Sequence, residues 1–584
     1  MNLDLIKGSR SRILAGLVLA IASVFAIRLF YLQIIQHGHY VGLAQTEQVK
    51  RERLPATRGE IYALNGNEPV KLVMNETVYT AFVDPVLIIE NGTADEIAKV
   101  MKEVAGGNLR PNIGYLLTKK ESRYQIIATR VTRTQAEKIR EHKFSGIGFQ
   151  SVSQRVYPEG TLGAQVLGFV NSEGIGNYGI EAYMNSDLSG TDGRLETVTD
   201  VSDVPLTVGD RNVRQPAVDG RNIVMTIDRN VQSYAEKALM DGLKRSNATD
   251  ASAVVMDPMT GRVLAIANVP TYDPAKYYEV TDVSLFNNAA ISVPYEPGSD
   301  IKTYTMAAAV DKGVASANDT FYNTDSIKVA DRTITNATKG HTGVISFQTA
   351  LNWSLNTGFV TLAQRMGNGT QITREARDTM YDYFHNRFGL GQLTGIELAN
   401  EQKGIVRSPD HPDGNAVRYS NMSFGQGLDS TVMQVSAGFS AIVNGGNFYR
   451  PTVIDGYIDS DGKYTKSEQA APVRPGVVKA TTSKEIKEMT HIGRSGFRGI
   501  DKPGYYVGGK TGTSQVVKNG VYSEDETIAT YLGYGGGDID SPKYVIMVSI
   551  HGKGRILGGS ADAMPIFNDI SNWMLDYLKI QPKG

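Results

Sequence analysis

The feature that most constrains this chain is one long apolar stretch near its N-terminus. In residues 13–35 only Gly16, Ser23, Arg28 and Gln33 are not strongly apolar. A stretch of this length can form a helix across a hydrocarbon layer ~30 Å thick. Arg28 lies off-centre, where its long side chain can reach the outer interface. No later segment resembles this one, so the sequence predicts a single membrane crossing.

Charged residues before this stretch predict its orientation. The basic residues that precede it are Lys7, Arg10 and Arg12. Only Asp4 opposes them, so the positive-inside rule places residues 1–12 in the cytoplasm and the bulk of the chain outside the membrane. Small residues at 20–22 leave a cleaved signal peptide as an alternative, and a buried core helix is another. Apolar residues continue past that site to position 35, which favours an uncleaved anchor.

Composition narrows the class of protein. Domains usually close at about 100–200 residues, so 584 residues predict two to four domains. With 41% hydrophobic and 21% charged residues, the chain is neither disordered nor a polytopic membrane protein. A formal net charge of -1 argues against nucleic-acid binding. The absence of cysteine excludes disulfides and thiolate chemistry, and the histidines form no H-E-x-x-H pattern, so no metal centre is expected.

Two regions of different character follow the apolar stretch. Residues 36–215 are polar and strand-rich, with Gly and Pro punctuation, and helical periods occur only near 93–105 and 132–143. This pattern indicates an extended spacer. The character then changes, because a strand pattern at 222–227 leads into a helical stripe over 231–243.

The C-terminal region predicts one α+β domain whose sheet is completed late. Apolar runs at 253–257 and 262–267 are joined by a short turn, which predicts a hairpin. Two further runs, at 528–534 and 543–550, flank a turn rich in Gly and Asp, and residues 565–578 form an amphipathic helix pattern with a proline in its first turn. Strands at both ends, with helix-rich sequence between them, indicate this fold class.

An S-x-x-K pattern marks a predicted helix start. Gly298 and Ser299 suit the first turn, and Ser299 and Lys302 then share one helix face. A serine hydroxyl becomes a nucleophile when a base takes its proton, and a lysine in a desolvated pocket can be neutral enough to do so. Backbone N–H groups at a helix start can also stabilise an oxyanion. Taken alone, the pattern equally describes a capping serine and a solvated lysine.

Two glycine-rich patterns suggest nucleotide binding, but their surroundings disagree. Residues 504–511 satisfy G-x-x-x-x-G-K-[ST], which needs a strand before it and a helix after it. Residues 499–503 do not resemble a strand, and residues 513–517 are β-branched. The G-x-G-x-x-G at 174–179 lacks a βαβ context. We therefore expect neither a phosphate loop nor a dinucleotide site.

Two further patterns carry chemistry of another kind. Ser354 and Asn356 follow a helical segment, where such residues are also common at ordinary helix ends. Lys510, Thr511 and Thr513 lie in a strand-like segment, whose hydroxyls and positive charge could bind a carboxylate while backbone N–H groups pair with a peptide.

The order of the three patterns is more specific than any one of them. Ser299, Ser354 and Lys510 each begin a pattern, and S-x-x-K, S-x-N and K-T-G in this order form the signature of penicillin-binding proteins and class A β-lactamases. The chain resembles class B penicillin-binding proteins, the monofunctional transpeptidases that one N-terminal helix anchors. Residues 58–62, 155–158 and 179–181 resemble the pedestal motifs of that family, and residues 388–391 and 423–427 are typical of its transpeptidase domain.

Two positions depart from the family pattern. Ala63 and Leu64 replace the usual Asp-Arg of the first pedestal motif, which removes the side chains of an interdomain ion pair. Asp300 and Ile301 stand where Thr-Phe or a similar pair is usual. The second change places a carboxylate beside the predicted nucleophile, where it favours a helix N-terminus but could weaken the binding of anionic β-lactams.

The resemblance implies a fold and a division into domains. It implies an α+β chain in which a β-lactamase-like transpeptidase domain, a central antiparallel sheet flanked by helices, follows an elongated strand-rich pedestal and one transmembrane helix. The predicted boundaries are a cytoplasmic tail at 1–12, an anchor at 13–35, a dimerisation-type pedestal at 36–215 and the transpeptidase domain at 216–584.

The resemblance also implies a mechanism. Lys302 would deprotonate Ser299, which attacks the carbonyl between the two terminal D-alanines of a stem peptide. Ser354 would pass a proton to the departing D-alanine, and an amine of a neighbouring stem peptide would resolve the acyl-enzyme. The backbone N–H groups of Ser299 and Thr513 would form the oxyanion hole. The substrate-binding residues implied are Asn356, Lys510, Thr511, Gly512 and Thr513. No metal or organic cofactor is needed.

The expected role is peptidoglycan cross-linking in cell wall synthesis at the cell membrane, in division more than in elongation. β-Lactams are the expected inhibitors, and the expected partners are a polytopic membrane glycosyltransferase and proteins of division or elongation, without nucleic acid. Two alternatives remain open. One is a D,D-carboxypeptidase or β-lactamase-like hydrolase, in which water meets the same acyl-enzyme, and the other is a non-catalytic scaffold of the wall-synthesis complex.

Overall fold

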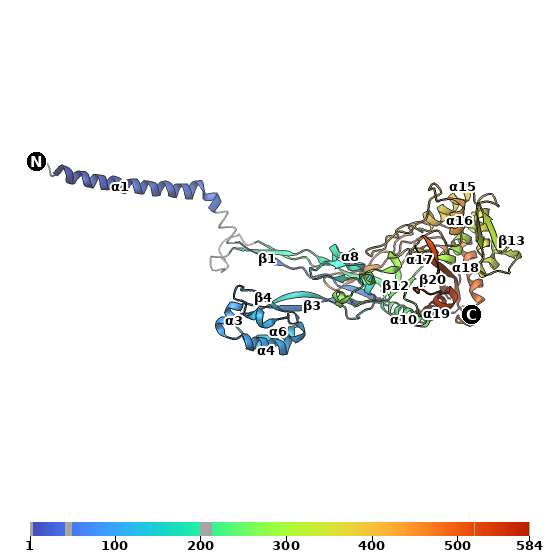
Figure 1. Cartoon of the computed structure of the whole chain (residues 1–584), viewed down its shortest axis with the longest axis horizontal. Coiled ribbons are helices and arrows are strands. Elements are labelled where there is room, and N and C mark those ends of the chain that lie inside the picture. Colours follow the sequence, from blue (N-terminus) through green and yellow to red (C-terminus); the bar gives the residue numbers. More distant parts are fainter. Residues whose placement is uncertain (1–3, 41–48, 199–212, 519, 583–584) are drawn as a thin grey trace. The chain divides into compact units, whose positions relative to one another are not determined.

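The computed structural model describes residues 4–40, 49–198, 213–518 and 520–582 (Figure 1). Residues 1–3 of the predicted cytoplasmic tail, and residues 41–48 and 199–212 of the predicted pedestal, lie outside the described residues. By its internal contacts the chain divides into two compact units. The first comprises Met1–Thr57 with Gly190–Gly220, and the second comprises Arg58–Ser189 with Arg221–Gly584.

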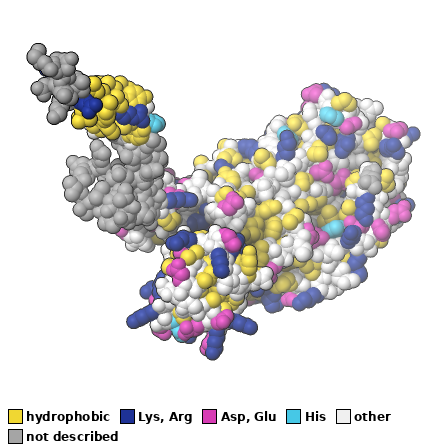
Figure 2. All heavy atoms as spheres, turned by 60° about the vertical axis from the view of Figure 1, so that its left-hand side comes forward, with side chains coloured by type: hydrophobic (Ala, Val, Ile, Leu, Met, Phe, Trp, Pro, Cys, Tyr) yellow, Lys and Arg dark blue, Asp and Glu magenta, His cyan; other side chains and the backbone are white. Residues whose placement is uncertain are grey.

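The first unit contains the long apolar helix. Helix α1 spans Asp4–Phe30 and continues into the π-helical turn η1 at Tyr31–Ile35. Within the described residues, Arg10–Ile35 is the one helical segment long and apolar enough to cross a membrane, and none of it is buried against protein. Figure 2 shows its apolar side chains as a nearly continuous exposed surface. A membrane anchor therefore fits this segment, and a buried core helix does not.

The first unit also contains a small antiparallel sheet of three strands. Strand β8 (Gly193–Val198) is the middle one, between β1 (Val49–Leu54) and β9 (Val213–Gln215). The remaining elements all belong to the second unit.

A compact α+β lobe begins the second unit. Its strands are β2 (Ile61–Asn65), β3 (Glu68–Val83), β4 (Gln125–Val131) and β5 (Ile147–Val156). Its helices are α3 (Pro85–Asn91), α4 (Ala94–Ala105), η2 (Gly106–Asn108), α5 (Ile113–Leu117) and α6 (Arg133–Glu141). The helical periods predicted near 93–105 and 132–143 are thus α4 and α6, which bury Ile97 and Ile139 in one apolar core with Ile127 of β4. Helix α6 begins with a capping box between Thr132 and Gln135.

One sheet joins this lobe to the C-terminal part of the unit. Its order is β18-β17-β10-β2-β3-β4, with β5 beside β3. Strand β10 (Asn222–Asp228) pairs in parallel with β2, and antiparallel with β17 (Ile454–Ile458), which in turn pairs with β18 (Tyr464–Lys466). The strand predicted at 222–227 is therefore confirmed, and it connects chain segments that are far apart in sequence.

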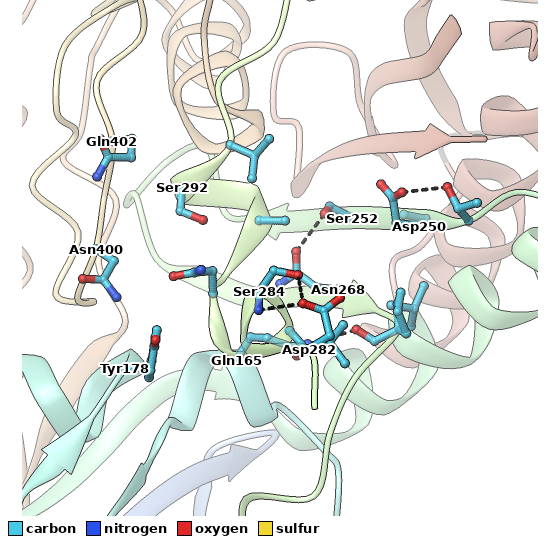
Figure 3. A pocket seen from close by; sticks show the side chains of 18 of the residues that line it. Gln165, Tyr178, Asp250, Ser252, Asn268, Asp282, Ser284, Ser292, Asn400 and Gln402 are labelled. Carbon is cyan, nitrogen blue, oxygen red and sulfur yellow. Dashed lines mark hydrogen bonds between the residues drawn. The ribbon is translucent and has the colours of Figure 1, made fainter. Parts of the chain in front are cut away.

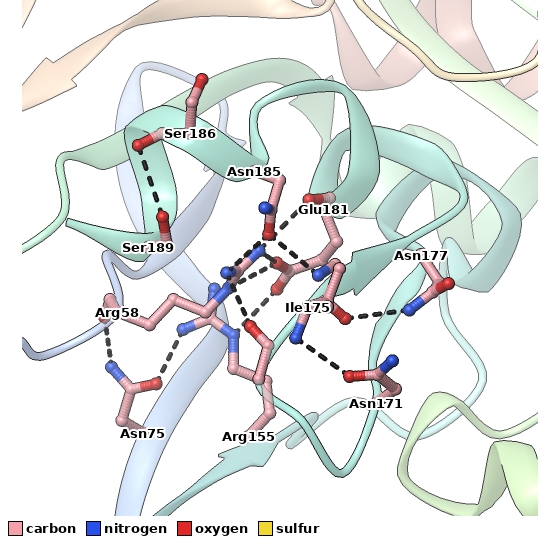
Figure 4. Close-up of polar contacts among 12 residues, drawn as sticks. Arg58, Asn75, Arg155, Asn171, Ile175, Asn177, Glu181, Asn185, Ser186 and Ser189 are labelled. Atoms are coloured by element: carbon pink, nitrogen blue, oxygen red, sulfur yellow. Dashed lines mark hydrogen bonds and ion pairs between the residues drawn. The ribbon is translucent and has the colours of Figure 1, made fainter. Parts of the chain in front are cut away.

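A buried cluster of charges holds the short elements near this sheet. These elements are α7 (Ala164–Leu167), β6 (Phe169–Val170), β7 (Gly176–Asn177), α8 (Gly179–Tyr183) and α9 (Asn185–Ser189). Glu181 is fully buried, and Nε of Arg58 and Nε of Arg155 each donate to one of its oxygens at 2.8 Å. Figure 4 shows both guanidinium groups converging on this carboxylate. The three pedestal motifs of the sequence thus meet at one point.

The main sheet of the second unit is antiparallel, in the order β12-β11-β21-β20-β19. Its strands are β11 (Asp250–Met256), β12 (Val263–Val269), β19 (Tyr506–Lys518), β20 (Val521–Gly536) and β21 (Tyr544–His551). The hairpin predicted at 253–267 and the late strands predicted at 528–550 are confirmed, because β11 pairs with β12 and also with β21. The sheet is therefore completed by the end of the chain.

Helices cover both faces of this sheet. On one face α10 (Arg229–Ser246) and α19 (Met564–Tyr577) pack together (Figure 1), and Tyr234 stacks on Trp573. The predicted proline lies in the first turn of α19. On the other face lie α12 (Lys302–Lys312), α17 (Val432–Val443) and α18 (Ala480–Ser495). The predicted fold class, a central antiparallel sheet flanked by helices, is confirmed.

The remaining elements complete the helical side and its insertions. The helices are η3 (Pro274–Glu279), η4 (Val283–Phe286), α11 (Ala289–Ser292), η5 (Gly298–Ile301), α13 (Phe347–Asn352), α14 (Asn356–Arg365), α15 (Arg374–Tyr381), η6 (Asp382–Arg387), α16 (Ala416–Met422) and η7 (Gly559–Ala563). The strands are β13 (Thr320–Asn323), β14 (Ser326–Val329), β15 (Arg332–Thr335) and β16 (Gly343–Ser346).

Candidate active site

A sharp helix start positions the S-x-x-K pair. The 3-10 turn η5 carries Ser299 and leads directly into α12, which begins at Lys302. Gly298 has φ +64°, and a Cβ on it would lie 2.7 Å from the carbonyl oxygen of Thr513. The glycine is therefore required both by its backbone conformation and by the close approach of β19. This contact brings the serine to the edge of the sheet.

The structure brings the three sequence patterns together around Lys302. This side chain is fully buried, and its Nζ lies 3.0 Å from Ser299 Oγ and 3.0 Å from Ser354 Oγ. It also contacts the carbonyl oxygen of Ser354 at 2.7 Å and Asn356 Oδ1 at 2.8 Å. From the opposite side Lys510 Nζ lies 3.0 Å from Ser354 Oγ. One serine hydroxyl thus lies between two lysine ammonium groups.

Burial sets the protonation of both lysines. Desolvation lowers the pKa of Lys302 well below its ordinary value, and the nearby charge of Lys510 lowers it further. Desolvation also lowers the pKa of Lys510, to about 8, although Asp300 opposes this shift. The lowered pKa favours the neutral amine of Lys302, which can accept the proton of Ser299, whereas a protonated Lys510 can attract an anion. The two lysines are therefore suited to different tasks.

Ser354 and Asn356 occupy the short connection between α13 and α14. Ser354 has φ +55°, a left-handed conformation that is uncommon for residues other than glycine. Strained residues of this kind concentrate at functional sites. Asn356 begins α14, and its Nδ2 donates to the carbonyl oxygen of Thr335 at 3.0 Å. Its side chain is thereby fixed on two sides, between β15 and Lys302.

The K-T-G residues lie within the outermost strand of the sheet. In β19, Lys510 pairs with Leu532 and Thr513 with Ala529 of β20, so the other edge of β19 has no partner strand within this sheet. Thr511 and Gly512 lie between these two positions in the strand. Gly512 is buried, and Thr513 is exposed. A phosphate loop would need a turn and a helix here, so the strand excludes that alternative.

The sequence alone did not identify Glu296 as part of this arrangement. Its Oε1 accepts from the backbone N–H of Gly427 at 2.7 Å and from the hydroxyl of Tyr522 at 3.2 Å. Gly298 N–H donates to the carbonyl oxygen of Gly425 at 3.0 Å. The segment before the nucleophile is thereby tied to the predicted 423–427 motif. The signal available in the sequence was the position of Glu296, three residues before Ser299.

Two cavities lie away from these residues. One of about 870 Å³ adjoins β11 and β12, the strands at the far side of the sheet from β19. Figure 3 shows Asn400 and Gln402 on one side of it and Asn268 and Asp282 on another. A second cavity, of about 1460 Å³, is lined by residues that include Asp228 and the C-terminal residues 577–582. Neither is lined by a predicted site residue.

The fold and the order of the three motifs point to one known class of protein, and comparison with protein families agrees. Residues 251–572 match the family described as the penicillin binding protein transpeptidase domain, and residues 53–225 match the penicillin-binding protein dimerisation domain. The chain belongs to the penicillin-binding protein transpeptidase family. The resemblance to class B penicillin-binding proteins, predicted from the sequence, is confirmed.

Relatives of the chain are similar over almost their full length. Stage V sporulation protein D of Bacillus subtilis is 31% identical, over 98% of this chain and 87% of the relative. The probable peptidoglycan D,D-transpeptidase PenA of Neisseria gonorrhoeae is 26% identical, over 99% of this chain and 94% of the relative. Among solved structures, penicillin binding protein 3 of Mycobacterium tuberculosis in its apo form has a TM-score of 0.66 at 26% identity, covering 91% of this chain and 99% of that one.

Proposed function

We propose that this protein is a membrane-anchored, serine-type peptidoglycan D,D-transpeptidase that cross-links stem peptides. The observation that carries the proposal is the position of Ser354 Oγ, 3.0 Å from both Lys302 Nζ and Lys510 Nζ, with Ser299 Oγ 3.0 Å from Lys302. Such an arrangement connects a nucleophile, a base and a cation by one continuous path for a proton. The names of the relatives, among them peptidoglycan D,D-transpeptidases, support the choice of substrate.

Acylation would use the two lysines differently. Neutral Lys302 takes the proton of Ser299, whose oxygen bonds to the carbonyl carbon of the penultimate D-alanine. The backbone N–H groups of Ser299 and Thr513 stabilise the resulting oxyanion. The proton then passes through Ser354 to the nitrogen of the terminal D-alanine, the C–N bond breaks, and free D-alanine departs.

Deacylation reverses the flow of protons. The amine of a second stem peptide attacks the acyl carbon, Lys302 accepts its proton, and the ester bond to Ser299 breaks as the serine oxygen is reprotonated. One peptide bond is lost and one is formed, so the exchange needs no external energy source. This balance suits a reaction outside the cytoplasm.

Substrate binding is assigned to the edge of β19. Lys510, Thr511 and Thr513 would bind the terminal carboxylate of the donor peptide through charge and hydroxyl groups. The free strand edge, with Gly512 in it, would pair with the peptide backbone. Asn356 would hold a peptide amide, since its Oδ1 and Nδ2 already lie in the site.

The proposal includes the setting predicted from the sequence. The N-terminus would be cytoplasmic and the catalytic part extracytoplasmic, with boundaries near residues 12, 35 and 215. The partners would be a polytopic membrane glycosyltransferase and division proteins, in preference to elongation proteins. A fluorescent fusion located at midcell would support the division role, and one along the side wall would favour elongation.

Labelling with a fluorescent penicillin tests the enzymatic proposal. The full-length membrane-anchored protein should form a covalent adduct that Ser299→Ala abolishes and that Ser326→Ala, a change on exposed strand β14, leaves intact. Lack of labelling in the folded wild type would favour the non-catalytic scaffold.

A product assay separates the transpeptidase from the hydrolase. With stem-peptide substrate and an acceptor amine, the wild type should release D-alanine and form cross-linked product together. Release of D-alanine without cross-links in the presence of the acceptor would favour the carboxypeptidase alternative.

A further inference from the structure

A buried carboxyl group lies directly behind the nucleophile. Asp300 follows Ser299 in η5 and has no exposed surface. Its side chain contacts Thr530 of strand β20 in the main sheet. Buried carboxyl groups are costly unless they are paired or hydrogen-bonded, so this one requires a physical reason.

The contacts of Asp300 place it against the K-T-G strand. Thr530 on β20, the register partner of Gly512, donates its hydroxyl to Asp300 Oδ2 at 2.6 Å. A Cβ on Gly512 would lie 2.8 Å from the same oxygen and would also collide with the Thr530 hydroxyl. Asp300 Oδ1 has no hydrogen-bond partner among the described residues. The carboxyl group thus lies against Gly512, which is two residues from Lys510 in β19 and therefore on the same face of that strand.

The charged and titratable groups around Asp300 come from four segments. Lys510 on β19 is the cation among them. Its charge lowers the pKa of Asp300, and the charge of Asp300 raises the pKa of Lys510. Three tyrosines also face it, and the negative charge of Asp300 contributes to the raised pKa of each. They are Tyr295 before η5, Tyr304 on α12 and Tyr531 on β20. All three are buried and neutral near pH 7, so Lys510 is the group that a charged Asp300 affects most.

We propose that Asp300 is a positioning residue that serves as the buried counter-ion of Lys510, so that Lys510 stays charged for carboxylate binding while Lys302 stays neutral as a base. This inference rests on the proposed function. Two lysines that share one serine hydroxyl would otherwise be nearly equivalent, and each would disfavour the charge of the other. A carboxylate behind one of them makes the pair asymmetric.

The electrostatic order of the site agrees with this role. Burial raises the pKa of Asp300 to about 7, and Thr530 and Lys510 oppose the rise. Asp300 raises the pKa of Lys510, and the charge of Lys510 in turn lowers the pKa of Lys302. Because Asp300 and Lys510 titrate together, loss of the carboxylate charge should change the pH dependence of the reaction at this site.

The test is the rate constant for acylation by fluorescent penicillin, measured on the full-length protein from about pH 6 to about pH 10. In the wild type the rate should fall on the alkaline side near the pKa of Lys510, about 8. Asp300→Asn keeps the shape and can still accept from Thr530, yet it removes the charge. It should move this alkaline limb down by about one pH unit or more, because burial then acts on Lys510 unopposed. The acid side of the profile should differ little between the two proteins, because the pKa of Asp300 is about 7 and the wild-type carboxyl group is itself largely protonated below that pH.

A structural role for Asp300 predicts a different result. Asp311→Asn, on helix α12 just after Asp300 in the chain, removes a buried carboxylate that accepts from Lys479 N–H and Thr482 Oγ1. It should lower the thermal midpoint and leave both pH limbs where they are. If Asp300→Asn behaves in the same way, the inference is overturned. If Asp300→Asn does not fold, the deciding variant is Thr530→Val. The alkaline limb of its acylation profile should also move to lower pH, and an unmoved limb overturns the inference.

Failure of the proposed function would look different again. A wild type that is never acylated at Ser299 contradicts the proposed function itself. A wild type that is acylated normally, with an alkaline limb that ignores Asp300→Asn, contradicts the counter-ion role alone.

Discussion

Two buried clusters of charge in the second unit are built in opposite ways. In the pedestal part, two guanidinium groups, of Arg58 and Arg155, share the carboxylate of Glu181 at 2.8 Å. In the candidate active site, two lysine amino groups, of Lys302 and Lys510, share the hydroxyl of Ser354 at 3.0 Å. Among the described residues neither lysine has a carboxylate within ion-pair distance. One cluster has its counter-charge in direct contact, whereas in the other Asp300 acts on Lys510 from beyond that distance.

The difference separates charge used for structure from charge used for chemistry. A buried ion whose partner fits it closely is stable but unreactive, because its charge is compensated. Arg58 and Arg155 have further acceptors, in Asn185 Oδ1 and Asn75 Oδ1. A buried ammonium without such a partner loses its proton more readily, which is what a general base requires. The comparison therefore predicts that removal of a charge stabilises the fold at the active site and destabilises it in the pedestal.

The largest effect on acylation is expected at the active-site cluster. Lys302→Met keeps the length of the side chain and removes the amine, so acylation should fall by about 10²–10⁴-fold. The free energy of unfolding should stay equal or rise, since a desolvated amine is replaced by an apolar group. Stopped-flow acylation and chemical denaturation measure the two quantities.

Lys312→Met is the matched control for this change, because Lys312 ends the same helix and pairs with Glu375 at the surface. It should alter neither quantity. A Lys302→Met protein that is strongly destabilised would show that Lys302 is compensated after all, and the contrast between the clusters would be lost.

In the pedestal a large loss of stability is expected, without a loss of acylation. Glu181→Gln removes the charge that both arginines share and leaves two buried guanidinium groups unpaired. The free energy of unfolding should fall by about 3–5 kcal/mol. Acylation per folded molecule should be unchanged, because Glu181 does not contact the active site.

Urea denaturation, read together with fluorescent-penicillin labelling of the remaining folded protein, checks both statements. Asp378→Asn breaks an exposed ion pair with Arg374 and should leave stability nearly unchanged. Equal behaviour of the two variants would show that the buried cluster has no special structural weight.

What the sequence could predict follows the range of the interactions concerned. Helices α4 and α6, the β11–β12 hairpin and the helix start at Ser299 depend on neighbours within a few residues, and local patterns identified them. The K-T-G segment was placed on a strand because its flanks excluded a loop and a helix. The order of the three motifs indicated the site through resemblance, since each motif alone was ambiguous.

What the sequence could not predict depends on pairing between distant segments. Strand β10 joins the pedestal sheet by pairing with β2, and no local pattern selects that partner. The role of Asp300 depends on Thr530, which lies 230 residues away. The left-handed backbone of Ser354 also lacks a local signal, because serine is not a residue that normally adopts it.

A smaller effect is expected where the two lysines meet. Ser354→Ala removes the hydroxyl that both ammonium groups contact, and acylation should fall by about 10²-fold because the proton path to the leaving group is lost. Ser354→Gly should fall equally, but it should be the more stable of the two by about 1 kcal/mol, since glycine adopts φ +55° without strain. An active Ser354→Ala variant would remove Ser354 from the proton path.

The smallest effect is expected at a third cluster, which is only partly buried. His551 lies 3.0 Å from both Asp250 and Glu526, and Lys518 also pairs with Glu526. Lys518, the N–H of Gly554 and His551 lower the pKa of Glu526 to about 2, and the two carboxylates raise the pKa of His551.

The sign of each shift fixes where this cluster stabilises the fold. The stability from Glu526 is present above its ordinary pKa of about 4.3 and is lost as the pH falls toward 2. The stability from His551 is complete below its ordinary pKa of about 6.5 and is lost as the pH rises through the higher folded value. His551→Gln should therefore lower the free energy of unfolding more at about pH 5 than at about pH 8, by less than about 1 kcal/mol. His142→Gln, at an exposed ring stacked on Phe144, should show no such pH dependence.

A partly compensated cluster would then lie between the two buried ones, with a small and pH-dependent contribution to stability. An equal loss at both pH values would instead show that the imidazole acts through packing alone.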